Sequence, residues 1–148
     1  MRTSTPLVVV VAAFAMLRVV EGAGLDAADE LEGSWRVVSA SREGAEAKDL
    51  QGHRLSFDRD RFVIRSARGE VRYRGTFKVD STKEPPTIDF QHETQALAGK
   101  TWLGVYRLDG NKLRICDNAV DPTQPRPTGF ESKPRSGSID VTFESATP

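Results

Sequence analysis

Strict alternation of apolar and polar residues over nine positions is the feature that most constrains the fold of this chain. From residue 71 to residue 79 the odd positions hold Val, Tyr, Gly, Phe and Val, and the even positions hold Arg, Arg, Thr and Lys. Successive side chains of a β-strand point to opposite faces, so a period of two predicts a strand with one buried and one solvated face. A helix, with 3.6 residues per turn, would scatter these apolar residues around its surface.

Shorter alternating segments recur along the chain, and no long segment has a convincing helical period. The expected strands cover residues 34–40, 54–57, 61–65, 71–79, 88–90, 102–108, 113–117 and 139–144. Eight antiparallel strands close into a barrel that leaves no edge exposed. The sequence therefore predicts an all-β fold, an eight-stranded antiparallel up-and-down barrel, with a sandwich of the same strands as the alternative. Such a barrel is filled by side chains or holds one small ligand.

The N-terminal segment has the parts of a secretory signal peptide. A positive start at Arg2 precedes an uninterrupted apolar run of 11 residues, Leu7 to Leu17, and small residues follow at positions 22–24. The run is shorter than the roughly 20 residues that span a bilayer. We expect a signal peptide at 1–22, a linker at 23–32 and the barrel domain at 33–145. The protein is then exported, periplasmic or extracellular, and without a stable membrane span after cleavage; an uncleaved N-terminal anchor is the alternative.

Charge and cysteine usage exclude some classes. The formal net charge of the 148 residues is zero, so no strong field attracts nucleic acid. An arginine-rich strip between residues 61 and 74 is balanced by nearby acids and is read as solvated strand faces. Cys116 is the only cysteine, which excludes an internal disulfide. Its parity places it outside the barrel or under a covering loop, where a buried, inert thiol is expected. The proline-rich segment 118–135 is expected to pack over the barrel or line its mouth.

The first expected strand opens with Gly33 and Trp35. Glycine two residues before the tryptophan lets the backbone bend or approach a neighbour closely. A large aromatic side chain at this place can plug one end of a closed barrel. Gly33 and Trp35 are therefore structural candidates, and plain core packing of Trp35 is the alternative.

Several segments together resemble a known family. The triplet Gly33-Ser34-Trp35 matches the glycine-any-tryptophan start of lipocalins. The stretches around it, at 31–40, 75–80 with 85–89, 99–116 and 126–138, resemble a lipocalin-like domain family common in planctomycete bacteria. The resemblance implies an exported lipocalin-like barrel without an established reaction or agreed catalytic residues. Lipocalins often pair the tryptophan with a late arginine, for which Arg114 or Arg135 could serve; Gly129 stands where the family more often has an acid.

Five inward residues are candidates for ligand binding. Tyr73 and Tyr106 share parity with apolar neighbours, so their hydroxyls enter an apolar space and need a partner there. Phe77 and Trp102 would line a cavity suited to a small amphipathic molecule. His92 shares the parity of Ile88 and Phe90 and would lie at the barrel rim. A packed core without a cavity is the alternative for the two tyrosines, Phe77 and Trp102. For His92 the alternative is a single hydrogen bond at the barrel rim.

No catalytic residue, metal site or cofactor is expected. His53 is read as a surface residue, and it lies far from His92 without the carboxylate spacing of a metal centre. The first hypothesis is an exported barrel that binds a small apolar or amphipathic ligand. The second is a filled barrel acting through its surface loops on an envelope protein partner. Enzyme activity is a third possibility, although no set of acid, base and nucleophile is visible.

Overall fold

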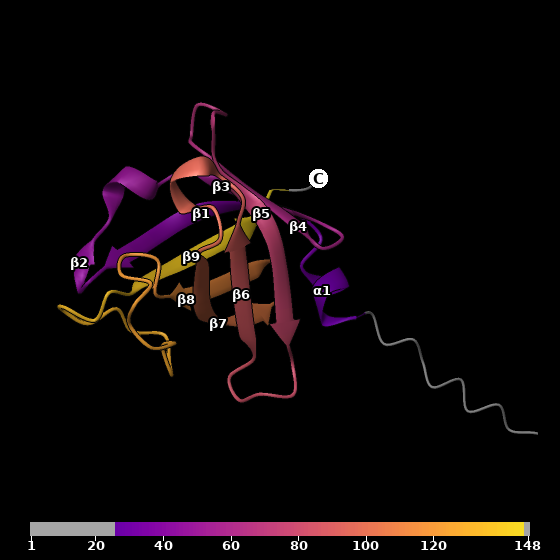
Figure 1. Ribbon diagram of the computed structural model, residues 1–148. Helices are drawn as coiled ribbons and strands as arrows, with labels where there is room; N and C mark the ends of the chain where they lie inside the picture. The colour runs from indigo at the N-terminus through magenta and orange to yellow at the C-terminus, as the bar shows by residue number, and fades with distance from the viewer. Residues whose placement is uncertain (1–25, 147–148) are drawn as a thin grey trace, which may run out of the picture.

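The structure, a computed structural model, describes residues 26–146. Eight strands form a closed antiparallel barrel, which confirms the predicted all-β fold (Figure 1). The predicted signal peptide lies outside the described residues. In chain order the elements are α1 (Ala27–Glu30), β1 (Gly33–Arg42), β2 (Ala45–Glu46), η1 (Lys48–Leu50), β3 (Arg54–Asp58), β4 (Arg61–Arg65), β5 (Val71–Asp80), β6 (Thr87–His92), η2 (Gln95–Leu97), β7 (Thr101–Asp109), β8 (Lys112–Asp117) and β9 (Ile139–Ser145).

The barrel is a meander in which each strand pairs with the next one. From β3 to β9 every neighbouring pair is antiparallel, and β1 pairs with both β3 and β9 to close the ring. This closure confirms the up-and-down barrel rather than the sandwich. The two-residue strand β2 extends the far end of β1, where Ser41 lies opposite Glu46.

One irregularity bends β1 so that it can pair on both sides. Between Val37 and Ser39 the register with β9 shifts by one residue, which leaves Val38 as an extra residue in β1. A bulge of this kind reverses the alternation and increases the local twist. Trp35 and Val37 are both 5% exposed before the bulge, and Ala40 packs against the core after it.

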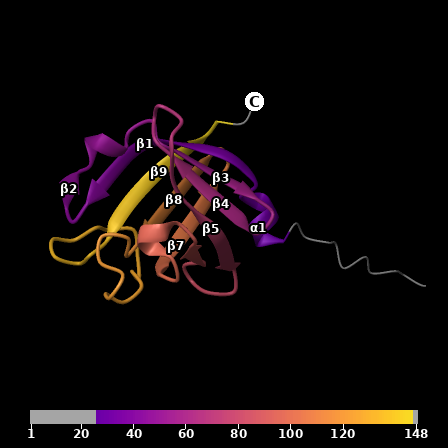
Figure 2. The ribbon, with the colours of Figure 1, turned by 45° about the horizontal axis from the view of Figure 1, so that its top comes forward.

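The end of the barrel near α1 is closed. Leu31 is fully buried there, and its carbonyl oxygen accepts a hydrogen bond of 2.8 Å from the indole Nε1 of Trp35. Gly33, between them, has a φ of 120°, a conformation that side chains larger than hydrogen rarely adopt. Trp35 therefore packs in the core at this closed end and ties the chain before β1 to it. Figures 1 and 2 place α1 and β2 on opposite sides of the barrel.

A cluster of phenylalanine rings fills the middle of the barrel. The ring of Phe57 lies 4.5 Å from that of Phe77 and 6.2 Å from that of Phe90. Phe62 meets Phe90 edge to face at 5.0 Å. All four rings are at most 4% exposed. Offset and edge-to-face contacts at these distances stabilise aromatic pairs beyond the area they bury.

The segment between β8 and β9 covers the outer face of the barrel. Its carbonyl at Glu131 lies 3.8 Å from the Sγ of Cys116, which is fully buried. Arg126 reaches the barrel wall, where its Nη1 donates to the carbonyl of Gly104 at 2.8 Å and lies 2.6 Å from a carboxylate oxygen of Asp89. In Figures 1 and 2 this segment is the orange loop below β2. The loop and the outward thiol agree with the sequence prediction.

Among residues 26–146, no helix has the length and apolar character needed to cross a membrane.

Candidate functional site

The part of the barrel away from α1 is hollow. A cavity of about 380 Å³ lies there, and the Phe90 ring of the central cluster forms part of its wall. Ligand pockets in proteins typically measure about 300–1,000 Å³, so this space is large enough for a small molecule. Its buried lining is apolar and aromatic, and includes Val37, Leu55, Phe90, Trp102, Ile115 and Phe143.

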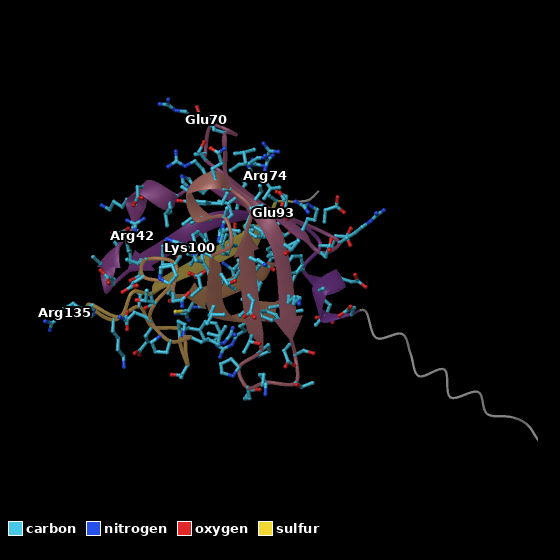
Figure 3. The ribbon with its side chains drawn as sticks, viewed as in Figure 1. Arg42, Glu70, Arg74, Glu93, Lys100 and Arg135 are labelled. Carbon is cyan, nitrogen blue, oxygen red and sulfur yellow. The ribbon has the colours of Figure 1, made fainter. Side chains whose placement is uncertain are left out.

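Charged residues surround the mouth of the cavity. The guanidinium of Arg42 binds both carboxylate oxygens of Asp49, at 3.1 and 2.9 Å, and this contact raises the pKa of Arg42 and lowers that of Asp49. Arg54 and Arg72 also line the mouth, are exposed, and form no ion pair within the described part of the chain. Figure 3 shows Arg42 beside β2, at the side of the barrel opposite α1. The mouth thus carries a surplus of positive charge.

His53 is part of this mouth, although the sequence suggested an ordinary surface residue. It is half-buried and lines the cavity. Burial lowers its pKa, and the nearby guanidinium of Arg72 lowers it further, against a smaller opposing effect of Asp49. His53 is therefore largely neutral at pH 7 and adds a polar group without charge to the mouth.

One carboxyl group lies inside the cavity wall. Asp117 is 7% exposed and lines the cavity at the end of β8. One of its carboxylate oxygens accepts a 3.0 Å hydrogen bond from the backbone amide of Ala119. Burial raises the pKa of Asp117 from 3.8 to about 7, and the hydrogen bond opposes this shift only in part. Asp117 is therefore about half ionised at neutral pH.

The cross-strand neighbours of Asp117 are uncharged and pack closely against it. Gly104 on β7 and Ile139 on β9 lie directly opposite it. A Cβ atom at Gly104 would come within 2.8 Å of the Cβ of Asp117, so a larger residue does not fit there. Asp117 has the same parity as Leu113 and Ile115 on β8, but no feature of the sequence marked it as a candidate site residue.

Three rings form a polar aromatic group in and behind the cavity wall. The Tyr73 ring meets the Trp102 ring at 5.1 Å, and His92 lies 3.9 Å from Trp102 and 5.7 Å from Tyr73. Tyr73 and Trp102 line the cavity, and His92 lies behind them. Within residues 26–146, neither ring nitrogen of His92 nor the indole nitrogen of Trp102 has a hydrogen-bond partner.

The structure brings together two of the five ligand-binding candidates. Tyr73 and Trp102 line the cavity, whereas Phe77, His92 and Tyr106 do not. Phe77 belongs to the central ring cluster. Tyr106 is 5% exposed, and its pKa is raised first by burial and then by acids of the α1 region. His92 is 2% exposed rather than at the rim, because its ring packs between Phe62 and Trp102.

The arginines suggested as partners of Trp35 serve elsewhere. Arg114 binds Asp140 through two hydrogen bonds of 3.0 and 2.6 Å and also donates to the carbonyl of Phe130. Figure 3 shows Arg135 pointing away from the barrel at the tip of the outer loop. The indole of Trp35 instead uses the Leu31 carbonyl. The arginine that sequence reasoning missed is Arg126, which joins the outer loop to β6 and β7.

Neither a reactive thiol nor a metal-ligand cluster is found at the cavity among the described residues. Burial raises the pKa of the Cys116 thiol to about 12, and this residue lies on the outer face of the barrel, away from the cavity. Among the described residues, no three His, Cys, Asp or Glu side chains are grouped so that they could hold a metal ion. The cavity offers an apolar surface, one buried carboxyl group and a positive mouth.

Comparison of the chain with protein-family models, with curated proteins and with solved structures finds no match in any of the three.

Proposed function

We propose that this protein is an exported carrier that binds a small amphipathic molecule inside its barrel. The observation that supports this best is the cavity of about 380 Å³, walled mainly by buried apolar side chains and open at one end. A barrel meant only as a scaffold gains stability by filling such a space, since unfilled volume forfeits packing contacts.

The polar groups of the cavity suit an amphipathic ligand rather than a purely apolar one. Arg54, Arg72 and His53 surround the mouth, and Asp117 lies inside. A ligand with one apolar body and polar ends would leave fewer of these groups without partners. The apolar segment Leu7 to Leu17 indicates that the protein is exported, and this part of the proposal is supported by the sequence alone.

Binding of the fluorescent apolar probe N-phenyl-1-naphthylamine tests the proposal. The probe should bind with one-to-one stoichiometry and enhanced fluorescence. The variant Ala119→Phe puts a ring into the cavity and should abolish binding, whereas Ala45→Phe, on exposed β2, should leave binding unchanged. If the probe does not bind the folded protein, or binds both variants equally well, the carrier proposal is wrong.

The two inward tyrosines supply a second matched pair. Tyr73 lines the cavity and Tyr106 does not, although both belong to the barrel interior. Tyr73→Ser should cost more free energy of probe binding than free energy of unfolding. Tyr106→Ser should do the reverse, because its ring packs in the closed part of the core. The opposite order would place the ligand outside the cavity described above.

A further inference from the structure

We propose that the ligand carries a protonated amine that pairs with Asp117, while its apolar body lies against Trp102, Tyr73 and Phe90. This inference rests on the proposed carrier function and specifies the chemical class of its ligand.

Asp117 is buried, and no cationic side chain among residues 26–146 pairs with it. It is 7% exposed, lines the cavity, and makes one hydrogen bond, to the amide of Ala119. A buried carboxyl group normally has an ion pair or several hydrogen bonds. In the described part of the chain, no cationic side chain lies within ion-pair distance of this carboxylate. A ligand ammonium would supply the charge that the protein itself does not.

The residues directly opposite Asp117 on the two neighbouring strands, Gly104 on β7 and Ile139 on β9, carry no charge. The titratable groups facing the same cavity come from β1, η1, β3 with the residue before it, and β5; they are Arg42, Asp49, His53, Arg54, Arg72 and Tyr73. None of them contributes to the pKa shift of Asp117, whose causes are burial and the Ala119 amide. Burial, and not a neighbouring charge, therefore accounts for the raised pKa of Asp117.

Aromatic rings line the same space as Asp117. Trp102 and Gly104 share the inward face of β7, and Gly104 lies opposite Asp117, so the indole is a diagonal neighbour of the carboxyl group. Tyr73 and Phe90 complete this wall. Aromatic rings attract cations through their quadrupole, most strongly for tryptophan and in desolvated sites. A carboxylate beside aromatic rings favours an organic ammonium over a neutral head group.

The positive mouth does not reverse this preference. Arg54 and Arg72 are exposed, so water and salt screen their field, and Asp49 neutralises Arg42. A ligand carboxylate inside the cavity would meet Asp117 as a like charge and would have to share its proton. The interior therefore selects for a cation, and the arginines remain available for a polar or anionic group at the outer end of the ligand.

Three probes of equal chain length test the inference: n-octylamine, n-octanol and sodium octanoate. Their affinities are measured by isothermal titration calorimetry on the unaltered protein and on Asp117→Asn. Octylamine should bind the unaltered protein at least about tenfold more tightly than octanol or octanoate. In Asp117→Asn this preference should disappear, while octanol affinity changes little. Binding of N-phenyl-1-naphthylamine to the variant verifies that its cavity is intact.

Proton release gives a readout that loss of packing would not produce. Titrations at pH 7 in buffers of different ionisation enthalpy should show a fraction of a proton released per octylamine bound, because Asp117 loses its proton when the ammonium pairs with it. No release should occur with Asp117→Asn. Equal or tighter binding of octanoate or octanol, or an amine preference that survives in Asp117→Asn, would overturn the inference and leave the carrier function standing. If neither these three compounds nor the fluorescent probe binds, both proposals fail.

Discussion

Asp117→Asn should make the empty protein more stable, and the gain should depend on pH. Burial raises the pKa of Asp117 from 3.8 to about 7. The folded state holds the Asp117 proton more tightly than the unfolded chain does. Between pH 3.8 and about pH 7 the folded protein therefore binds more protons than the unfolded protein. Stability from this residue is thus fully present below pH 3.8 and is lost as the pH rises toward 7. A shift of about three pKa units corresponds to about 4 kcal/mol.

Asparagine imitates the protonated form at every pH. It keeps an oxygen that can accept the hydrogen bond from the Ala119 amide, and it carries no charge. The variant and the unaltered protein should therefore have similar unfolding free energies near pH 4. At pH 8 the variant should be more stable by about 4 kcal/mol, a large part of the 5–15 kcal/mol typical of a folded domain.

Urea unfolding followed by tryptophan fluorescence at several pH values between 4 and 8 measures this difference. The comparison must be made between the two proteins, because His92 titrates with the opposite sign. Its pKa is lowered by burial from 6.5 to about 4, so its contribution is lost as the pH falls through this range. Both proteins carry His92, and its effect cancels in the difference. A difference that does not vary with pH, or a less stable variant at pH 8, would refute the reasoning.

Three further predictions concern residues outside the cavity wall. His92→Phe removes two buried nitrogens that have no hydrogen-bond partner among the described residues. In urea unfolding, the unfolding free energy of the variant minus that of the unaltered protein should be about 2 kcal/mol more favourable at pH 5 than at pH 8, because only the unaltered protein has to keep a buried imidazole neutral. A difference that is the same at both pH values would contradict the burial of a neutral imidazole. Arg126→Met should lower the unfolding free energy measured by thermal denaturation by about 1–3 kcal/mol, since three polar contacts to β6 and β7 are lost. The control Arg68→Met, at an exposed position, should change it by less than about 0.5 kcal/mol. Equal effects would show that Arg126 does not stabilise the outer loop on the barrel. Cys116 should resist alkylation by iodoacetamide at pH 8 until the protein is unfolded, because its pKa is raised to about 12 and its side chain is fully buried. Rapid labelling of the folded protein would show that the outer loop does not cover this thiol.

The strands could be predicted because each carries its own alternation. The segment Val71–Asp80 forms β5 with Gly75 and Phe77 buried and Arg74 and Lys78 exposed, as the period of two requires. The number of strands and the hairpin-like links between most of them favoured a closed ring over a sandwich, and the pairing of β1 with β9 decides between the two. The bulge at Val38 could not be foreseen, because it depends on how β9 meets β1 after the ring has closed.

The site was harder to predict than the fold, since alternation tells only whether a side chain points inward. Tyr73 and Tyr106 are equivalent by this criterion, yet they lie in the open and the closed parts of the barrel. The difference arises from depth along the barrel, which strand tilt and register determine. His92 illustrates the same limit: its inward direction was predicted, but the packing of Phe62 and Trp102 around it was not.

The wall beside Asp117 is tightly packed. A Cβ atom at Gly104 would collide with the Cβ of Asp117 and with the carbonyl oxygen of Cys116, both at 2.8 Å, so no larger residue fits beside the acid. A scaffold selected only for stability would remove the carboxyl group, which above pH 7 opposes folding by about 4 kcal/mol. Retaining a residue that destabilises the empty barrel is consistent with function if a bound cation pairs with the carboxylate and offsets its cost in folding free energy. Functional sites commonly keep residues that lower the stability of the protein alone.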